Sequence, residues 1–156
     1  MPFMIETSVK ESTICGAGNG RFFENNYKKD TIVRKQEYNS EELRILRNEF
    51  ELREFDITYI QKYGHSAPVN SEYDCIFLNN PPMFTNHSSS PNIYFIYGDN
   101  FKYTLTSRDV ERGEEMLQDY GEYKIIDWYE TYINNNNAKS LASFGREINR
   151  ETICNY

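Results

Sequence analysis

The sequence F-T-N-H-S-S-S-P-N occupies residues 84–92 and gathers polar side chains in one short segment. Asn86 and His87 follow an apolar residue directly, and the proline then leads into a strand-like run. Asn86 offers an amide with a donor side and an acceptor side, and His87 offers a donor and an acceptor, which suits a site for a polar ligand. The simpler interpretation is a turn in which Asn86 and Ser88 hydrogen-bond to the local backbone. Taken alone, the residues favour the turn.

A second segment, S-T-I-C-G-A-G-N-G-R-F-F at residues 12–23, places three glycines at alternate positions. Glycine allows positive φ angles and a close approach of the backbone to a ligand, and its amides can then face a carboxylate or a phosphate. By itself this pattern is more often a flexible turn between strands. A dinucleotide site needs a helix directly after the glycines. Because Arg21, Phe22 and Phe23 continue as a strand, we discount a Rossmann site.

A third segment, S-R-D-V-E-R-G-E-E-M-L-Q-D-Y-G, occupies residues 107–121. It predicts a turn at Arg112 and Gly113, followed by a brief strand through Met116 and Leu117. The tyrosine Tyr120 stands just before another glycine. From residue type alone, Tyr120 is interpreted as a buried core tyrosine with a hydrogen-bonded hydroxyl.

These three segments resemble, in order and approximate separation, the motifs of SET-domain protein lysine methyltransferases. Residues 84–92 resemble F-I-N-H-S-C-x-P-N, residues 12–23 resemble S-x-I-x-G-A-G-x-G-x-F-A, and residues 107–121 resemble R-D-I-x-x-G-E-E-L-T-x-D-Y-G. The resemblance covers roughly residues 12–121, and it is to the compact stand-alone type found in large DNA viruses. Three motifs in the family's order are far more specific than any one of them.

The chain departs from the family's pattern at several positions. Thr85 and Ser89 stand where the family has isoleucine and cysteine, and Met83 replaces an arginine. The segment R-K-Q-E-Y at residues 34–38 stands where the family commonly has E-Y-x-G-E, so an expected pocket aromatic is displaced to Tyr38.

The resemblance implies transfer of a methyl group from S-adenosylmethionine to the side-chain amine of a lysine in a protein, with a histone tail among the candidates. It implies a catalytic Tyr120, a substrate channel at Gln118 and Tyr38, and no metal. Gln118 would hydrogen-bond the lysine nitrogen or leave space for methyl groups, and its simpler interpretation is a solvent-facing side chain on a strand. Trp128 or Tyr129 would cover the cofactor or serve as a plain core aromatic. The implied cofactor-binding residues are Ala17, Gly18, Asn19, Gly20, Asn86, His87 and Trp128.

Two alternatives to this function stay open. One is a non-catalytic SET-like protein-binding module that keeps the cofactor pocket, which the displaced Tyr38 and the polar Gln118 favour and the intact Tyr120 opposes. The other is a methyltransferase acting on a non-histone protein or on a residue other than lysine.

Composition limits the class of protein and of partner. The chain has 156 residues, the size of a single domain, and its 13 tyrosines and 10 phenylalanines predict an aromatic core. A formal net charge of -7 and a pI of about 4.9 argue against nucleic acid as the main partner and favour a basic, lysine-containing protein or peptide. A homodimer stays open. The first ten residues carry no long apolar run, so neither a signal peptide nor a membrane anchor is expected.

The cysteines Cys15, Cys75 and Cys154 are widely spaced and odd in number. They match neither a C-x-x-C metal pair nor an even disulfide set, which favours a reducing, intracellular setting. His65 is the second histidine of the chain and is interpreted as a solvated loop residue.

The expected fold class is mostly β with short helices, an α+β arrangement. The resemblance implies small antiparallel sheets with the C-terminal tail threaded beside the central motif in a pseudoknot. One domain, 1–156, would have a core at about 3–126, a helical insert at about 38–70 and a helical C-terminal extension at about 127–156. Strands are predicted near residues 3–9, 31–35, 74–78, 93–97 and 101–107, the last two as a hairpin. Helices are predicted from Ser40 through Phe50, after Asp56 to about Gly64, and at 125–133 and 138–148.

Overall fold

The structure is a computed structural model that describes residues 3–37, 42–46, 56–66, 74–79, 83–98 and 100–148. Short strands in these ranges pair into small sheets, of which all but one are antiparallel. The antiparallel sheets are β1 (Thr7–Glu11) with β2 (Asn19–Phe23), β3 (Ile32–Glu37) with β9 (Phe101–Thr106) and β8 (Ile93–Tyr97), and β4 (Glu42–Leu46) with β6 (Cys75–Asn79) and β5 (Gly64–His65). The parallel pair is β7 (Asn86–His87) with β10 (Leu117–Gln118). The helical elements are α2 (Ile57–Tyr63), the 3₁₀ turn η1 (Tyr120–Glu122), α3 (Asp127–Asn135) and α4 (Leu141–Ile148).

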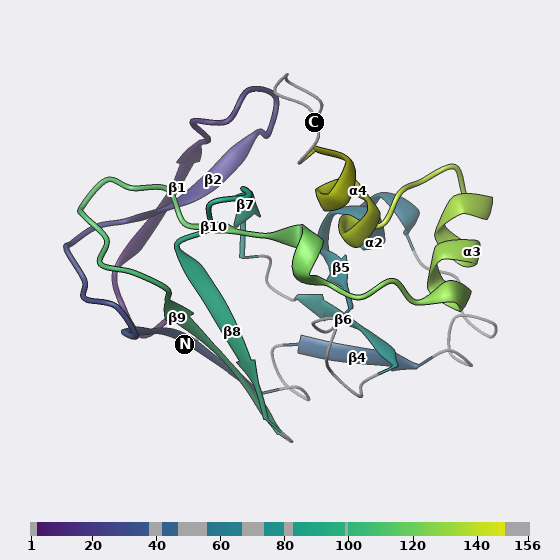
Figure 1. Ribbon diagram of the computed structural model, residues 1–156, viewed down its shortest axis with the longest axis horizontal. Coiled ribbons are helices and arrows are strands. Elements are labelled where there is room, and N and C mark those ends of the chain that lie inside the picture. Colours follow the sequence, from purple (N-terminus) through teal and green to yellow (C-terminus); the bar gives the residue numbers. More distant parts are fainter. Residues whose placement is uncertain are drawn as a thin grey trace.

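The elements divide into two sides that meet at the parallel pair. The β1–β2 and β3–β9–β8 sheets form one side, and the helices α2, α3 and α4 gather with the β4–β6–β5 sheet on the other (Figure 1). The strands β7 and β10 lie between them, with η1 directly after β10. The segments singled out in the sequence therefore meet where the two sides join.

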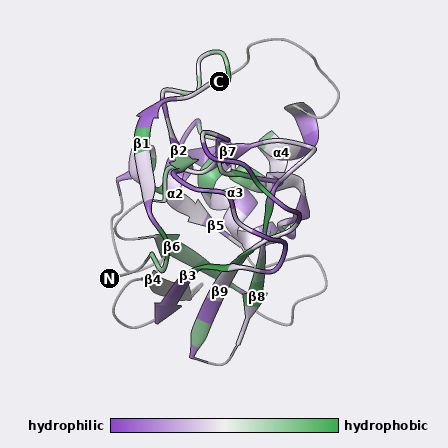
Figure 2. Cartoon of the chain, turned by 90° about the vertical axis from the view of Figure 1, so that its left-hand side faces the viewer, coloured by the Kyte–Doolittle hydropathy of each residue, from purple (hydrophilic) through white to green (hydrophobic). Residues whose placement is uncertain are grey.

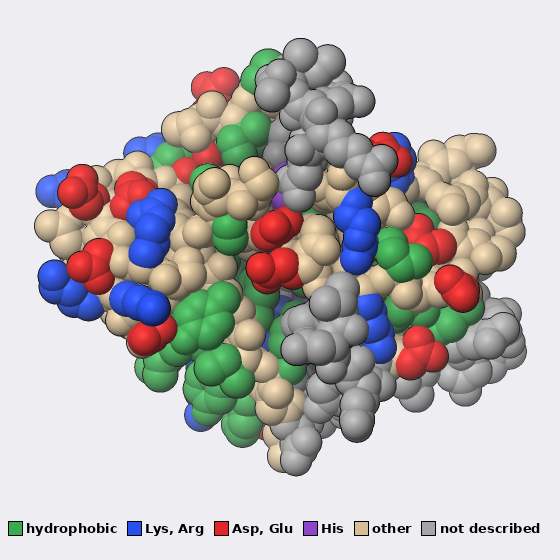
Figure 3. Space-filling view, in the orientation of Figure 1, with side chains coloured by type: hydrophobic (Ala, Val, Ile, Leu, Met, Phe, Trp, Pro, Cys, Tyr) green, Lys and Arg blue, Asp and Glu red, His purple; other side chains and the backbone are tan. Residues whose placement is uncertain are grey.

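Each side has its own apolar core. On the helical side, β6 packs against α2 and α3 through Ile76, Ile60 and Ile133, all buried. On the other side, Phe23 and Val33 are fully buried in a cluster that extends to the third segment. Figure 2 shows hydrophobic residues concentrated inside, for example along β6. Figure 3 shows hydrophobic side chains also gathering on the surface over β8 and β9, and the β8 residue Ile96 is 49% exposed.

Most predicted elements are confirmed, with ends displaced by a few residues, as is usual for element boundaries. The β8–β9 hairpin forms, and Gly113 takes a positive φ of 92° at the predicted turn. Asp56 caps α2, because its carboxylate accepts from the backbone N–H groups of Thr58 at 3.0 Å and Tyr59 at 3.4 Å. No helix follows the glycine segment, in agreement with the rejection of a dinucleotide site.

The helix predicted from Ser40 is wrong over the part that the structure describes. Residues 42–46 form β4, which pairs with β6 along its whole length. The segment E-L-R-I-L satisfies a helical spacing and a strand alternation equally over so short a run. Pairing with a buried neighbouring strand decides between them. Ser40 and Phe50 lie outside the described residues.

The prediction of a solvated His65 is also wrong. His65 is 3% exposed, because β5 pairs with β6 and carries the ring inside. The ring stacks on Tyr123 at 4.8 Å between centroids. Its Nδ1 lies 2.9 Å from the carbonyl oxygen of Ser66, and its Nε2 lies 3.4 Å from the Lys102 ammonium. A carbonyl only accepts, so Nδ1 carries the proton in the contact with Ser66.

The cysteines only partly follow expectation. Cys75 is buried and forms no disulfide, whereas Cys15 is disulfide-bonded. Spacing along a chain does not show which thiols meet in space, which is why the sequence missed this bond. In the parts of the chain that are described, no helix combines the length and apolarity that a membrane span requires. No group of three or more His, Cys, Asp or Glu in those parts is arranged to hold a metal ion.

We predict that Asp56→Ala destabilises the protein by about 1 kcal/mol, because two N–H groups of the first turn of α2 lose their acceptor. Urea unfolding followed by circular dichroism measures the change. Asp127→Ala is the matched control, since Asp127 lies in the first turn of α3 and makes no side-chain cap. Equal losses in the two variants would show that the Asp56 cap adds nothing beyond a first-turn charge.

Candidate functional site

A cavity of about 560 Å³ lies where the two sides of the molecule join. Its volume falls within the range of about 300–1,000 Å³ that is usual for small-molecule sites. The glycine segment, residues 83–86 and the end of α2 form parts of the wall. The other lining residues are His65, Gln118, Tyr120, Lys139 and the α4 residues Leu141 and Phe144.

The structure brings most of the sequence-predicted site residues together. Ala17, Gly18, Asn19, Asn86, Gln118 and Tyr120 all line the cavity. Gly20 and His87 lie directly behind the wall, through contacts described below. Tyr38 lies outside the described residues, and Trp128 is found elsewhere in the fold.

The glycine segment folds back on itself before entering β2. Gly16 and Gly18 take φ angles of 73° and 74°, a region that favours glycine. The backbone N–H of Ser12 donates to the Gly18 carbonyl at 2.8 Å, which closes the turn. A Cβ at Gly18 would meet nothing within 4 Å, so backbone conformation rather than space requires glycine there.

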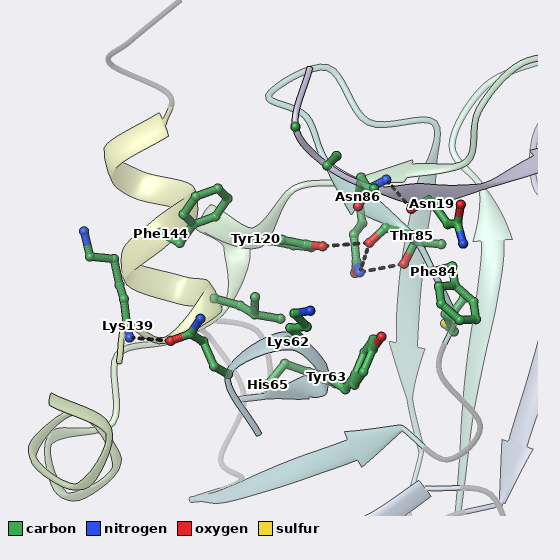
Figure 4. Close-up of a pocket in the computed structure, with 17 residues that line it drawn as sticks. Asn19, Lys62, Tyr63, His65, Phe84, Thr85, Asn86, Tyr120, Lys139 and Phe144 are labelled. Carbon is green, nitrogen blue, oxygen red and sulfur yellow. Dashed lines mark hydrogen bonds between the residues drawn. The ribbon is translucent and has the colours of Figure 1, made fainter. Parts of the chain in front are cut away.

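Asn86 ties the central motif to this turn. Its Nδ2 donates to the backbone carbonyl of Asn19 at 3.0 Å (Figure 4). The same Nδ2 also donates to Oε1 of Glu115 at 3.2 Å. Glu115 is 6% exposed and also accepts from the Thr13 hydroxyl at 2.8 Å. A Cβ on Gly20 would stand 1.9 Å from Oε1 of Glu115, so glycine leaves room for the carboxylate. Sequence reasoning missed Glu115, although its place in G-E-E was a usable signal.

His87 acts on Tyr120 from behind the wall. It is 4% exposed, and its Nδ1 accepts from the backbone N–H of Tyr120 at 3.0 Å. The two rings lie 5.2 Å apart. The Asp119 carboxylate is 3.6 Å from the same Nδ1. Because Nδ1 accepts a hydrogen bond, it carries no proton in this arrangement, so His87 and Asp119 do not form an ion pair.

Tyr120 and Gln118 converge on Thr85. The Tyr120 hydroxyl donates to the Thr85 carbonyl at 2.7 Å, and Nε2 of Gln118 donates to the Thr85 hydroxyl at 2.7 Å (Figure 4). Gln118 is 7% exposed, so the interpretation in which it faces solvent is wrong. Phe84, one residue earlier, has a φ of 58°, a strained value for a bulky side chain, and its ring lines the cavity. Arg21 secures the turn by donating to the Met83 carbonyl at 2.7 Å.

The C-terminal part of the chain places one aromatic side chain in the cavity wall. This side chain is Phe144 and not the predicted Trp128. Trp128 packs against the core between α2, β6 and α3, and its indole N–H donates to Asp74 at 3.2 Å. Phe144 lies on α4 near Tyr120, at 6.3 Å between ring centroids. A Cβ on Gly145 would stand 2.5 Å from the Gly121 nitrogen, so this glycine lets α4 press directly on η1. Helical spacing alone does not reveal which tail aromatic turns inward.

The two lysine side chains at the cavity, Lys62 and Lys139, point in different directions. The Lys62 side chain stands at the wall beside Tyr63, whereas that of Lys139 extends away from it (Figure 4). The Lys139 ammonium pairs with Glu147. Near the site, the pKa of Glu122 is raised mainly by partial burial and to a lesser extent by the Asp119 carboxylate. The described residues that line the cavity include no Asp or Glu.

Comparison with known proteins shows which family has this arrangement. The model of the SET domain family matches residues 18–121, more than half of the chain. The chain belongs to the SET-domain family. A solved structure of apo ctPRC2 with two mutations in Ezh2 contains a chain of similar fold, with a TM-score of 0.57 and 15% identity. The match covers 79% of this chain and 16% of that chain, so it supports the fold alone. No curated protein matches.

We predict that Glu115→Ala lowers the free energy of unfolding by about 1–3 kcal/mol, because the Asn86 amide and the Thr13 hydroxyl lose a charged hydrogen-bond acceptor. Glu115→Gln is the control, since it keeps the shape and the Thr13 hydroxyl can reverse to accept from the new amide. Urea unfolding of both variants measures the difference. A loss as large in Glu115→Gln as in Glu115→Ala would mean that the charge, and not the hydrogen bonding, matters.

Proposed function

We propose that this SET-domain protein transfers a methyl group from S-adenosylmethionine to the side-chain amine of a lysine in a protein substrate. The observation that carries the proposal is that one cavity joins the glycine segment, the amide of Asn86 and the hydroxyl of Tyr120. A family member with these three groups on one cavity has both a place for a cofactor and a polar group for an amine.

The chemistry of the wall fits the cofactor. S-adenosylmethionine supplies an electrophilic methyl group on a sulfonium, together with a carboxylate and an adenosine. The exposed amine of Lys62 suits the carboxylate, while Asn86 and the backbone around Asn19 suit polar atoms. Phe144 and Leu141 add apolar contact for a flat base.

Tyr120 is the residue proposed to orient the amine. Its hydroxyl donates to the Thr85 carbonyl, and a phenol that donates its hydrogen still offers its oxygen as an acceptor. An N–H of the target amine can bond to that oxygen, which points the nitrogen lone pair toward the methyl carbon. The lone pair forms the new N–C bond, the methyl–sulfur bond breaks with its electron pair going to sulfur, and the amine releases a proton to solvent.

The cavity also favours the reactive form of the amine. A lysine amine has an unperturbed pKa of about 10.4, and only the neutral form has a lone pair to react. Burial among Tyr63, Phe84 and Tyr120 penalises the ammonium, and the positive sulfonium of the bound cofactor would act in the same direction. No carboxylate among the described lining residues offsets these effects. The net charge of -7 supports a basic region of a protein as the substrate.

A non-catalytic binding module is the second candidate function. It is favoured by Gln118, a polar residue whose amide is bonded on both sides and lines the cavity with Tyr120. Incubation with labelled S-adenosylmethionine, core histones and cell extract, followed by mass spectrometry, separates the two. Methyl-lysine on any protein supports the enzyme, and cofactor binding without transfer supports the module.

We predict that Asn86→Ala binds S-adenosylmethionine at least about fivefold more weakly, the effect of losing a hydrogen bond at a buried site. Isothermal titration calorimetry without added metal measures the affinity. Asn134→Ala, an exposed change on α3, serves as the control and should bind normally. An unchanged affinity in folded Asn86→Ala would remove Asn86 from the cofactor site.

We further predict that Tyr120→Phe keeps cofactor binding within about twofold while single-turnover methyl transfer falls by at least about 100-fold, because the hydroxyl acts mainly in the reacting geometry. Tyr132→Phe on α3 is the control and should react normally. If the rate of Tyr120→Phe matched that of the unmodified protein, the hydroxyl would serve only to hold Thr85.

A further inference from the structure

We propose that Arg21 is a positioning residue for methyl transfer: it holds the backbone before Phe84 and so keeps the Phe84 ring in the cavity wall. The proposal rests on the proposed lysine methyltransferase function. Arg21 is not among the described residues that line the cavity, so it acts on the reaction only through Phe84. The family's glycine motif leaves position 21 open, so the resemblance implies no role for this arginine.

The Arg21 guanidinium joins three segments. It projects from β2, its Nε donates to the Met83 carbonyl at 2.7 Å, and its Nη1 donates to the Thr7 hydroxyl on β1 at 2.7 Å. A guanidinium is planar and offers its donors at fixed angles, so two bonds to different segments fix its position. The direction of the Met83 carbonyl is therefore set from outside the turn that contains it.

Aromatic packing holds the same guanidinium from one side. The centre of the Phe3 ring lies 4.0 Å from the guanidinium carbon of Arg21 and 4.9 Å from that of Arg34, which is fully buried. The Phe3 backbone forms a bridge with Arg34, and the N–H of Met4 donates to the Val33 carbonyl at 2.8 Å. The segment before β1 thus helps to fix Arg21, although none of its described residues lines the cavity.

Phe84 needs this support because of its backbone conformation. Its φ is 58°, a region that a bulky side chain rarely adopts and that persists only where the surroundings enforce it. The angle φ relates the peptide plane of the Met83 carbonyl to the rest of Phe84. Arg21 holds that plane, and the Tyr120 hydroxyl holds the Thr85 carbonyl on the other side of Phe84 at 2.7 Å. When Arg21 is removed, Phe84 can return to a negative φ, which redirects its ring.

The Phe84 ring closes part of the cavity wall. It meets the Tyr63 ring edge-on, at 6.3 Å between centroids and 78° between planes, and both rings line the cavity (Figure 4). Phe84 belongs to the central motif and Tyr63 to the end of α2, so this contact joins two separate segments. A ring that leaves the wall admits water to an amine held by Tyr120. The ammonium is then penalised less, and a smaller fraction of the amine is neutral.

Arg21→Met tests the proposal, because it keeps a long apolar stem beside Phe3 and removes the donors. We expect the midpoint of the pH–rate profile to rise by about half a pH unit or more, since the pKa of the amine moves back toward its unperturbed value of about 10.4. Transfer of labelled methyl from S-adenosylmethionine to core histones, measured from neutral to alkaline pH, gives the midpoint. Arg112→Met, at an exposed arginine, is the control and should leave the midpoint unchanged.

The pH profile separates positioning from a general structural effect. The cavity is lined by titratable side chains that both variants retain, namely Lys62, Tyr63, His65, Tyr120 and Lys139. A difference in midpoint therefore reports the surroundings of the amine. A lower rate with an unchanged midpoint would show that Arg21 only stabilises the fold, and would overturn the proposal.

A second background asks whether the effect passes through the ring. In Phe84→Ala, the further change Arg21→Met should leave the midpoint unchanged, because there is no ring left to position. An equal rise in midpoint with and without the Phe84 ring would contradict the proposal.

Another measurement does not depend on turnover. In protein labelled with para-fluorophenylalanine, the fluorine resonance of Phe84, assigned by its loss in Phe84→Leu, should move in Arg21→Met and stay in place in Arg112→Met. An unmoved resonance would overturn the proposal whatever the activity. If the resonance moves and the protein binds S-adenosylmethionine but methylates no protein, the proposed function fails, and the role of Arg21 in methyl transfer fails with it.

Arg21→Lys covers the case in which Arg21→Met does not fold. It keeps a cation near Phe3 but lacks the planar fork that reaches both Met83 and Thr7. The midpoint and the fluorine resonance should then change in the same direction as in Arg21→Met, by a smaller amount. No change in either measurement would refute the positioning role.

Discussion

The parallel pairing of β7 with β10 places the central motif beside the segment that carries Tyr120. Only two residues of each strand take part. The pairing is extended by Asn92, whose side chain donates to the Glu115 carbonyl and accepts from the Leu117 N–H, both at 2.8 Å. Asn86 reaches the glycine segment and His87 reaches the backbone of Tyr120. Each of these motif side chains therefore joins two distant parts of the chain, and the cavity exists because all three connections are made.

Local chemistry made part of this fold predictable. The Asp56 cap, the β8–β9 hairpin and the glycine turn depend on neighbours in sequence, and each was predicted from residue type and spacing. β4, the burial of His65 and the inward turn of Phe144 depend on partners far along the chain. A five-residue run such as E-L-R-I-L carries no information about a strand that comes after a long insertion. The resemblance located the cavity, whereas the roles of Glu115 and Arg21 became visible only through their contacts.

One departure from the family's pattern has a partner close by. Thr85 stands where the family has isoleucine, and its hydroxyl accepts from the amide of Gln118. An isoleucine at position 85 would leave that amide hydrogen without this partner, at a cost of about 1–3 kcal/mol for a buried polar group. Considered alone, the threonine suggests a damaged pocket. Together, the two residues form a polar wall with its hydrogen bonds satisfied.

The contact between Gly145 and η1 bears on when the site forms. Glycine inside a helix costs about 1 kcal/mol relative to alanine, so α4 gives up local stability to come close to the backbone of Tyr120. A helix that is weak alone and strong when docked forms together with its partner. The growing chain should therefore complete the cavity only after its last described helix has docked, so the site is among the last parts of the fold to form.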